Sequence, residues 1–133
     1  MRLRVLALVL TLAGPAGAEI LHAKGVMLRM LDKSSGIVTD YDLASGQSKT
    51  SGRLTIQLDD CRYPSDLPTG EAYAHLTILD SEAKEPAFKG WMIASSPALS
   101  ALDNPRYDVW VLRCDVPEAD MPATTAPAEG SGG

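Results

Sequence analysis

The stretch Arg53-Leu54-Thr55-Ile56-Gln57-Leu58 alternates polar and apolar residues without a break. Successive side chains of a β-strand point to opposite faces of its sheet, so this pattern predicts a strand with one buried and one exposed face. Cys61 lies one step out of phase with the three apolar positions. We therefore expect either a β-bulge or the end of the strand near Asp59-Asp60.

Strand-like patterns recur on both sides of this stretch, separated by turns rich in Gly, Pro, Asp and Ser. They cover residues 26–31, 37–43, 53–58, 72–79, 88–94 and 107–114. Strands and helices do not alternate as in a parallel sheet. We therefore predict a mainly β fold, a small antiparallel barrel or sandwich of about six strands.

Two details of this fold are predicted from local sequence. Ser96 can cap a helix with Pro97 in its first position, and Leu99 and Leu102 then share one face, which predicts one short helix. The segment 107–114 is apolar on both faces, which favours a central strand.

Cys61 and Cys114 are the only cysteines. In an oxidising compartment, two cysteines far apart in the chain indicate a structural disulfide, and free thiols or a chemical role are the alternatives. Cys114 is in phase with Trp110 and Leu112, so we expect its sulfur to be buried.

The first residues have the three parts of a secretory signal. Met1-Arg2-Leu3-Arg4 is basic, residues 5–13 are apolar and uncharged, and Ala16-Gly17-Ala18 supplies small residues for cleavage. We therefore predict that residues 1–18 are a cleavable signal peptide. The apolar run is too short for a transmembrane span, and no cysteine lies near the cleavage point to accept a lipid anchor. The expected product is a soluble periplasmic protein that begins at Glu19.

Composition sets the remaining limits. Loss of Arg2 and Arg4 with the signal peptide changes the net charge from −5 to −7, which argues against nucleic acid and anionic membranes as partners. Residues 19–116 have the size of one β domain. Residues 117–133 contain mainly Pro, Ala, Thr, Glu, Gly and Ser, and we predict a disordered tail there.

Two longer motifs resemble a known family. They are Gly90-Trp91-Met92-Ile93-Ala94-Ser95-Ser96-Pro97-Ala98-Leu99 and Pro105-Arg106-Tyr107-Asp108-Val109-Trp110-Val111-Leu112-Arg113-Cys114. With Leu31-Asp32-Lys33-x-x-Gly36, Gly52-Arg53-Leu54 and Cys61, they make residues 24–115 similar to the bacterial secreted family named domain of unknown function 2155. The resemblance implies an envelope protein with one β domain and no assigned reaction. Asn104 is a departure, because the family pattern leads us to expect His before the proline at 105.

A catalytic interpretation is weak. Ser95 or Ser96, with His75 and Asp103, supplies the residue types of a hydrolase triad. However, the G-x-S-x-G elbow is missing, capping explains Ser96-Pro97, and His75 lies where a surface residue of a strand would lie.

Metal binding is also poorly supported. The acidic segment Asp32-x-Ser34-x-Gly36, followed by Asp40 and Asp42, lacks EF-hand spacing. The two histidines, His22 and His75, are too few for a closed zinc site. We expect no catalytic residue, metal or cofactor.

The aromatic segments are the remaining candidates for function. Tryptophan, methionine and arginine are enriched at interface cores, although both tryptophans could equally belong to the protein core. The candidate interaction surface comprises Trp91, Met92, Ser95, Ser96, Pro97, Tyr107 and Trp110. The leading hypothesis is a non-enzymatic binding or structural domain that acts on a partner protein or an envelope polymer. The alternatives are a small envelope hydrolase that uses Ser95 or Ser96, and a small-ligand carrier.

Overall fold

The structure is a computed structural model that describes residue 14 and residues 17–121. The predicted signal peptide, residues 1–18, lies almost entirely outside the described residues, as do residues 122–133. Within the described part, no helix is long and apolar enough to cross a membrane. The elements in chain order are β1 (Ile20–His22), β2 (Gly25–Asp32), β3 (Val38–Ala44), β4 (Ser48–Ser51), β5 (Leu54–Pro64), β6 (Tyr73–Asp80), β7 (Phe88–Ile93), β8 (Tyr107–Asp115) and the 3-10 helix η1 (Glu118–Asp120).

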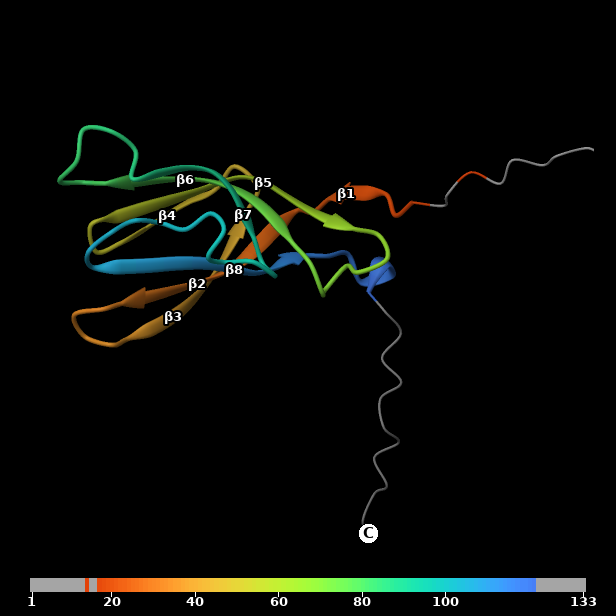
Figure 1. Ribbon diagram of the computed structural model, residues 1–133, viewed down its shortest axis with the longest axis horizontal. Helices are drawn as coiled ribbons and strands as arrows, with labels where there is room; N and C mark the ends of the chain where they lie inside the picture. Colours follow the sequence, from red (N-terminus) through yellow and green to blue (C-terminus); the bar gives the residue numbers. More distant parts are fainter. Residues whose placement is uncertain (1–13, 15–16, 122–133) are drawn as a thin grey trace, which may run out of the picture.

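The strands form two antiparallel sheets that face each other (Figure 1). The larger sheet has the order β1-β5-β6-β7, with β4 also paired to β5, and the smaller sheet has the order β3-β2-β8. The mainly β prediction is confirmed, and the arrangement is sandwich-like. Strands β1 and β4 were not predicted, because they are three and four residues long and carry no run of apolar alternation.

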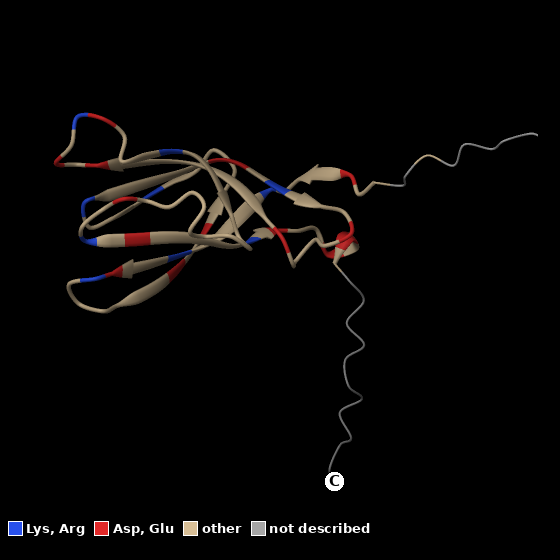
Figure 2. Cartoon of the chain, in the orientation of Figure 1, with Lys and Arg blue, Asp and Glu red and all other residues tan. Residues whose placement is uncertain are grey.

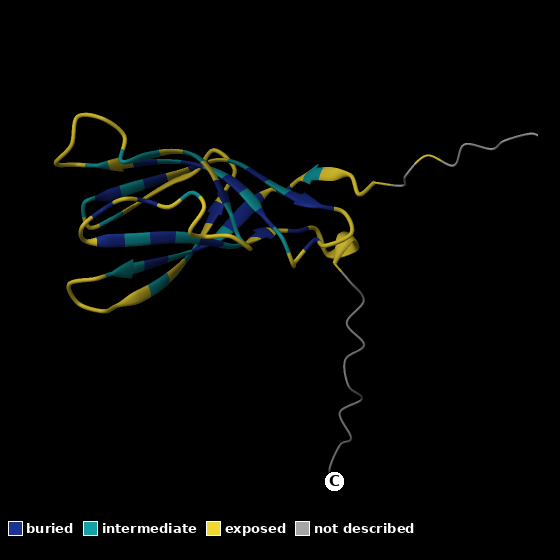
Figure 3. Ribbon diagram, viewed as in Figure 1, coloured by how far each residue is buried: buried dark blue, intermediate teal, exposed yellow. Residues whose placement is uncertain are grey.

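The core lies between the sheets and is built by alternation along the longer strands, interrupted at the bulges (Figure 3). On β5, Leu54, Ile56 and Leu58 are buried, as their spacing predicts. Leu76 on β6 and Leu28 on β2 are fully buried in the same cluster. The outward side chains of the larger sheet are therefore the polar and aromatic residues between these positions.

The predicted disulfide joins the two sheets. Cys61 on β5 is bonded to Cys114 on β8, with their Cα atoms 5.9 Å apart. Cys114 is buried as expected, but its predicted phase is wrong. Leu28 pairs with Val111 and Met27 with Arg113, so Leu112 is an extra residue that shifts Cys114 to the inward face.

The predicted short helix is wrong. Residues 94–106, which we call the strap, form turns and irregular chain, with the Leu99 amide donating to the Ser96 carbonyl. Leu99 is 77% exposed while Leu102 is buried, so the two do not share a face. The strap must run the length of the sandwich, from the end of β7 to the start of β8, and a helix advances only about 1.5 Å per residue against about 3.3 Å for extended chain.

The predicted central position of the last strand is also wrong. Among the described strands β8 pairs with β2 alone, so it is an edge strand of the smaller sheet. The strap runs beside this edge, where Pro97 and Leu102 line a hollow with Val109 and Trp110. Trp110 is half-buried there although its strand does not lie in the middle of a sheet.

At the C-terminal end, regular structure continues past residue 116. Residues 118–120 form η1, and the Tyr63 hydroxyl donates to the Asp120 carboxylate at 2.9 Å. The predicted tail therefore begins with a short structured turn, and its remaining residues 122–133 lie outside the described part.

Candidate functional site

The β-bulge in β5 creates the most distinctive surface of the molecule. Leu58 pairs with Leu76 and Asp60 with His75, while Asp59 between them has no partner on β6. Leu58 and Cys61 both point inward, and the extra residue lets Asp59 and Asp60 both contact outward-facing side chains. The expected bulge is confirmed, and it places two neighbouring carboxylates on one face of the sheet.

Asp59 holds three side chains of this face. Its Oδ2 lies 2.7 Å from His75 Nδ1 and accepts a hydrogen bond from the Thr77 hydroxyl at 2.8 Å. Its Oδ1 accepts from the Gln57 amide at 3.1 Å. A carboxylate only accepts hydrogen bonds, so His75 carries its proton on Nδ1 in this contact.

Asp60 holds the residues on the other side of the bulge. Its Oδ2 accepts from Arg62 Nε at 2.7 Å, and its Oδ1 lies 3.1 Å from His22 Nδ1 on β1. Desolvation opposes ionisation of Asp60, but the hydrogen bonds from His22 and Arg62 outweigh it and lower the pKa of the carboxyl. Asp60 is therefore negatively charged at neutral pH.

Trp91 on β7 connects the two halves of this network. The Arg62 guanidinium lies over the Trp91 ring, 4.8 Å from its centroid, and the His75 ring meets it edge-on at 5.1 Å. The indole is 37% exposed. A cation over the ring and an edge contact are both favourable to an aromatic side chain, so the indole is fixed in place while part of it faces solvent.

An apolar hollow of about 400 Å³ lies beside the indole. Ile20, Arg62, Tyr73, Trp91 and Ile93 line it. We call the whole surface the Trp91 face, and its members are Ile20, His22, Gln57, Asp59, Asp60, Arg62, Tyr73, His75, Thr77, Trp91 and Ile93.

The predicted interaction residues separate into several places. Trp91 belongs to the Trp91 face, but Met92 and Tyr107 are each only 2% exposed, so the prediction that they lie on a surface is wrong. Met92 follows Trp91 directly on a strand and therefore points to the opposite side. Pro97 and Trp110 meet at the strap, against the smaller sheet.

Ser95 and Ser96 lie in the turn that follows β7. The Ser95 hydroxyl donates to the Glu71 carboxylate, which also accepts the Ser95 amide at 3.1 Å. Desolvation raises the pKa of Glu71, but the hydrogen bonds from Ser95 and Ala72 outweigh this and lower it. The Ser96 amide donates to the Ile93 carbonyl at 3.1 Å, so both serines serve the turn.

The hydrolase triad is not assembled. His75 pairs across the strands with Trp91, and Ser95 lies four residues further along, about 13 Å away at about 3.3 Å per residue. Asp103 precedes Asn104, whose amide donates to Asp80 at the far end of β6. The carboxylate that does contact His75 is Asp59.

Two of the three aspartates considered for calcium, Asp32 and Asp40, pair with arginines instead. Asp40 accepts two hydrogen bonds from Arg29, at 2.7 and 2.9 Å, and Asp32 accepts from Arg106 and from the Ser34 amide. Among residues 17–121 no group of three or more His, Cys, Asp or Glu side chains is arranged to hold a metal ion.

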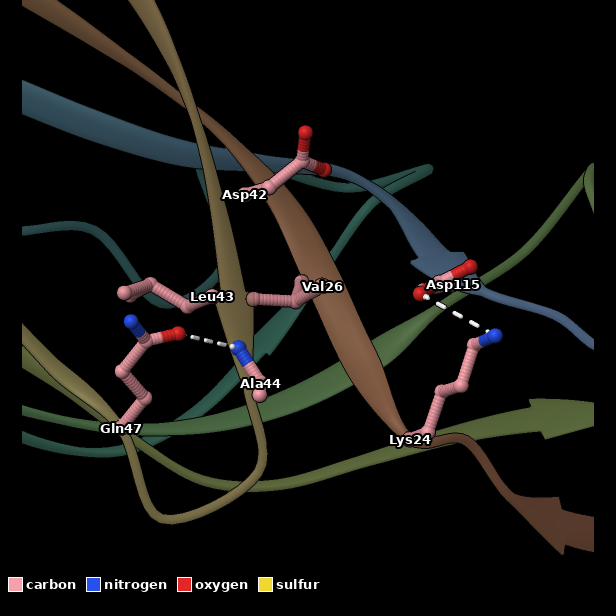
Figure 4. A pocket seen from close by; sticks show the side chains of 7 residues that line it. All are labelled: Lys24, Val26, Asp42, Leu43, Ala44, Gln47 and Asp115. Carbon is pink, nitrogen blue, oxygen red and sulfur yellow. Dashed lines mark hydrogen bonds and ion pairs between the residues drawn. The ribbon is translucent and has the colours of Figure 1, made fainter.

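A second hollow, of about 560 Å³, opens beside β2 and β3 (Figure 4). The Gln47 side chain accepts the Ala44 amide at 2.9 Å, Lys24 lies 4.0 Å from Asp115, and Asp42 completes the polar lining. The residues that line it include no aromatic side chain, in contrast to the hollow beside Trp91.

Sequence reasoning missed most of the Trp91 face. His22, Asp60, Arg62 and Tyr73 come from three strands and meet only through pairing. The usable signal was the predicted bulge, because two adjacent polar residues between two inward positions must both be accommodated on the outward face.

Comparison with known proteins gives a family but no activity. The family model described as "Uncharacterized protein conserved in bacteria (DUF2155)" matches residues 26–114. The uncharacterized protein RP359 of Rickettsia prowazekii (strain Madrid E) is 29% identical over 87 residues, which cover 63% of this chain. The aligned region spans about half of that relative, 56% of its length. No solved structure matches. The chain therefore belongs to the DUF2155 family of uncharacterized bacterial proteins.

Proposed function

We propose that this protein is an exported, non-enzymatic envelope protein that binds a partner protein or an envelope polymer through the Trp91 face. One observation carries the proposal. The indole of Trp91 is partly exposed, yet it is contacted by Arg62 and His75, and each of these is held by its own aspartate at the bulge.

This arrangement has the properties of a binding hot spot. Tryptophan, tyrosine and arginine are the residues most enriched where interface energy concentrates. Hydrogen bonds already fix these side chains, so binding costs less of their conformational entropy. The apolar hollow next to Trp91 supplies a place for a partner side chain.

The two alternative functions have less support. A hydrolase that uses Ser95 would first have to break the hydrogen bond from its hydroxyl to Glu71, and it would lack a histidine within reach. A small-ligand carrier needs open space inside the sandwich, whereas Leu54, Leu58 and Leu76 are fully buried in one packed cluster.

Site-specific photocrosslinking in cells tests the proposal. A photoreactive amino acid replaces Tyr73 on the Trp91 face or, as a matched control, Leu112 on the outer face of the smaller sheet. We expect a reproducible crosslinked species from position 73 and not from position 112. Crosslinks of equal yield from both positions, or from position 112 alone, would contradict the assignment.

A further inference from the structure

We propose that the segment bound at the Trp91 face is a cationic peptide of a partner protein, with basic side chains on both sides of an apolar one. This inference rests on the proposed function and narrows its partner to one chemical class. It depends on the hollow, on the carboxylates around it and on the distance between them.

The hollow selects an apolar side chain. Trp91, Tyr73, Ile93 and Ile20 supply its walls, and Ile20 is 52% exposed although it lies in a strand. Covering such a surface removes apolar area from water, at about 25 cal/mol per Å².

The charged groups around the hollow are three carboxylates and two cations, Arg62 and the exposed Lys89, which pairs with Thr77 on the same face. Asp59 and Asp60 lie at the bulge, and Glu71 lies at the other end, just before β6. The one guanidinium in the hollow belongs to Arg62, which is already bound to Asp60 and stacked on Trp91. Figure 2 shows further acidic residues, in red, at the end of the sandwich where β1 begins and η1 lies.

This charge distribution selects among occupants. Asp60 and Arg62 neutralise each other, which leaves the Asp59 and Glu71 carboxylates to repel an anionic lipid surface, a nucleic acid or an acidic polymer. Lysine or arginine side chains of a peptide would meet carboxylates at both ends of the hollow. A cationic protein segment is therefore the occupant that fits both the apolar walls of the hollow and the carboxylates at its two ends.

The spacing of the carboxylates makes the inference more specific. Glu71 is four residues before His75, whose ring contacts Asp59, so the Asp59 and Glu71 carboxylates lie about 13 Å apart along the strand direction. Extended chain covers this distance in about four residues. We therefore expect two basic residues about four positions apart, with an apolar residue between them.

Selection from a random dodecapeptide display library tests the inference. The bait is the exported protein with its disulfide intact, and the Trp91→Ala variant removes peptides that bind elsewhere. We expect the enriched peptides to carry Lys or Arg on both sides of Leu, Phe or Trp. Synthetic copies should bind Glu71→Gln about fivefold more weakly, the effect of one exposed charge pair. Glu85→Gln, the same change in the loop between β6 and β7, should bind like the unmodified protein.

The possible outcomes separate the two proposals. Uncharged or acidic peptides whose binding needs Trp91 would overturn the cationic inference and leave the proposed binding face standing. Peptides that bind the Trp91→Ala variant equally well count against both. No enrichment over that variant also overturns the inference, and the photocrosslinking experiment then decides the proposed function on its own.

Discussion

The two tryptophans lie on opposite sheets, and their surroundings differ in kind. Trp91 stands on the open face of the larger sheet, where Arg62 of β5 and His75 of β6 contact its ring. Trp110 lies half-buried on an edge strand of the smaller sheet and lines a hollow there with Pro97, Ala98, Ala101 and Leu102 of the strap. One indole is fixed by polar groups and left partly accessible, and the other is packed by a segment of its own chain. We therefore propose a recognition role for Trp91, whereas the surroundings of Trp110 indicate packing.

The largest expected loss of stability comes from removing the disulfide that joins the two sheets. Replacing both cysteines, Cys61→Ala with Cys114→Ala, should lower the free energy of unfolding by about 4 kcal/mol, because the bond closes a long loop in the unfolded chain. Urea denaturation measures this loss. The unmodified protein treated with a reductant serves as the control and should lose a similar amount. Unchanged unfolding midpoints in both samples would show that the sheets hold together without the bond.

Replacing each tryptophan by alanine tests the difference between the two sites. Trp110→Ala should lower the free energy of unfolding by about 2 kcal/mol, because it removes the indole and leaves a cavity between the strap and β8. Trp91→Ala should cost about 1 kcal/mol, because its ring is already partly in solvent. Thermal unfolding gives the stabilities, and crosslinking from position 73 gives the interaction. If Trp110→Ala abolishes the crosslink while Trp91→Ala leaves it intact, the two roles are reversed.

Deleting one residue tests how the Trp91 face is built. Without Asp59, Leu58, Asp60 and Cys61 would pair in an unbroken register, so the protein should fold and form its disulfide. His75 and Thr77 would lose their acceptor, at a cost of about 1 kcal/mol.

The matched control for this deletion lies on the same strand. Deleting Thr55 removes a residue from a regular part of β5 and shifts Leu54 to the wrong face. We expect that chain to fail to fold. Intact mass, which is lower by two hydrogens when the disulfide forms, reports the outcome for both deletions. Equal behaviour of the two deletions would contradict the role given to the bulge.

The smallest expected effect concerns charge on the smaller sheet. The hydrogen bond from Arg106 lowers the pKa of Asp32 from 3.8 to about 2, against an opposing effect of desolvation and with help from Ser34. Because the folded-state pKa lies below the ordinary value, the contribution of Asp32 to stability is complete above about pH 4 and is lost as the pH falls towards 2.

Melting curves at several pH values test this contribution. The difference in melting temperature between the unmodified protein and Asp32→Asn should be largest at pH 5 and should shrink at pH 2. A difference that stays constant across this range would mean that the contact with Arg106 does not depend on the charge of Asp32.

Local patterns predicted six of the eight described strands and the bulge, because side-chain alternation is a property of neighbouring residues. Arg53 to Leu58 and the misplaced phase of Cys61 were enough for β5. The strap was misread as a helix because local capping preferences do not include the distance that a connection must cover. Trp91 and Trp110 could not be told apart, since their surroundings come from residues distant in the chain. His22 and Asp60, 38 residues apart, are one such pair.

The bond between Cys61 and Cys114 also changes what a cut in the chain would do. It closes residues 61–114 into a covalent ring that contains β6, β7, the strap and β8. The strap carries Leu99, an exposed residue that a protease can reach. A single nick there would linearise the ring without releasing a fragment, and both pieces would keep the strands that pair them. On a gel the nicked protein would run as one chain until it is reduced, so the damage would stay hidden wherever disulfides persist.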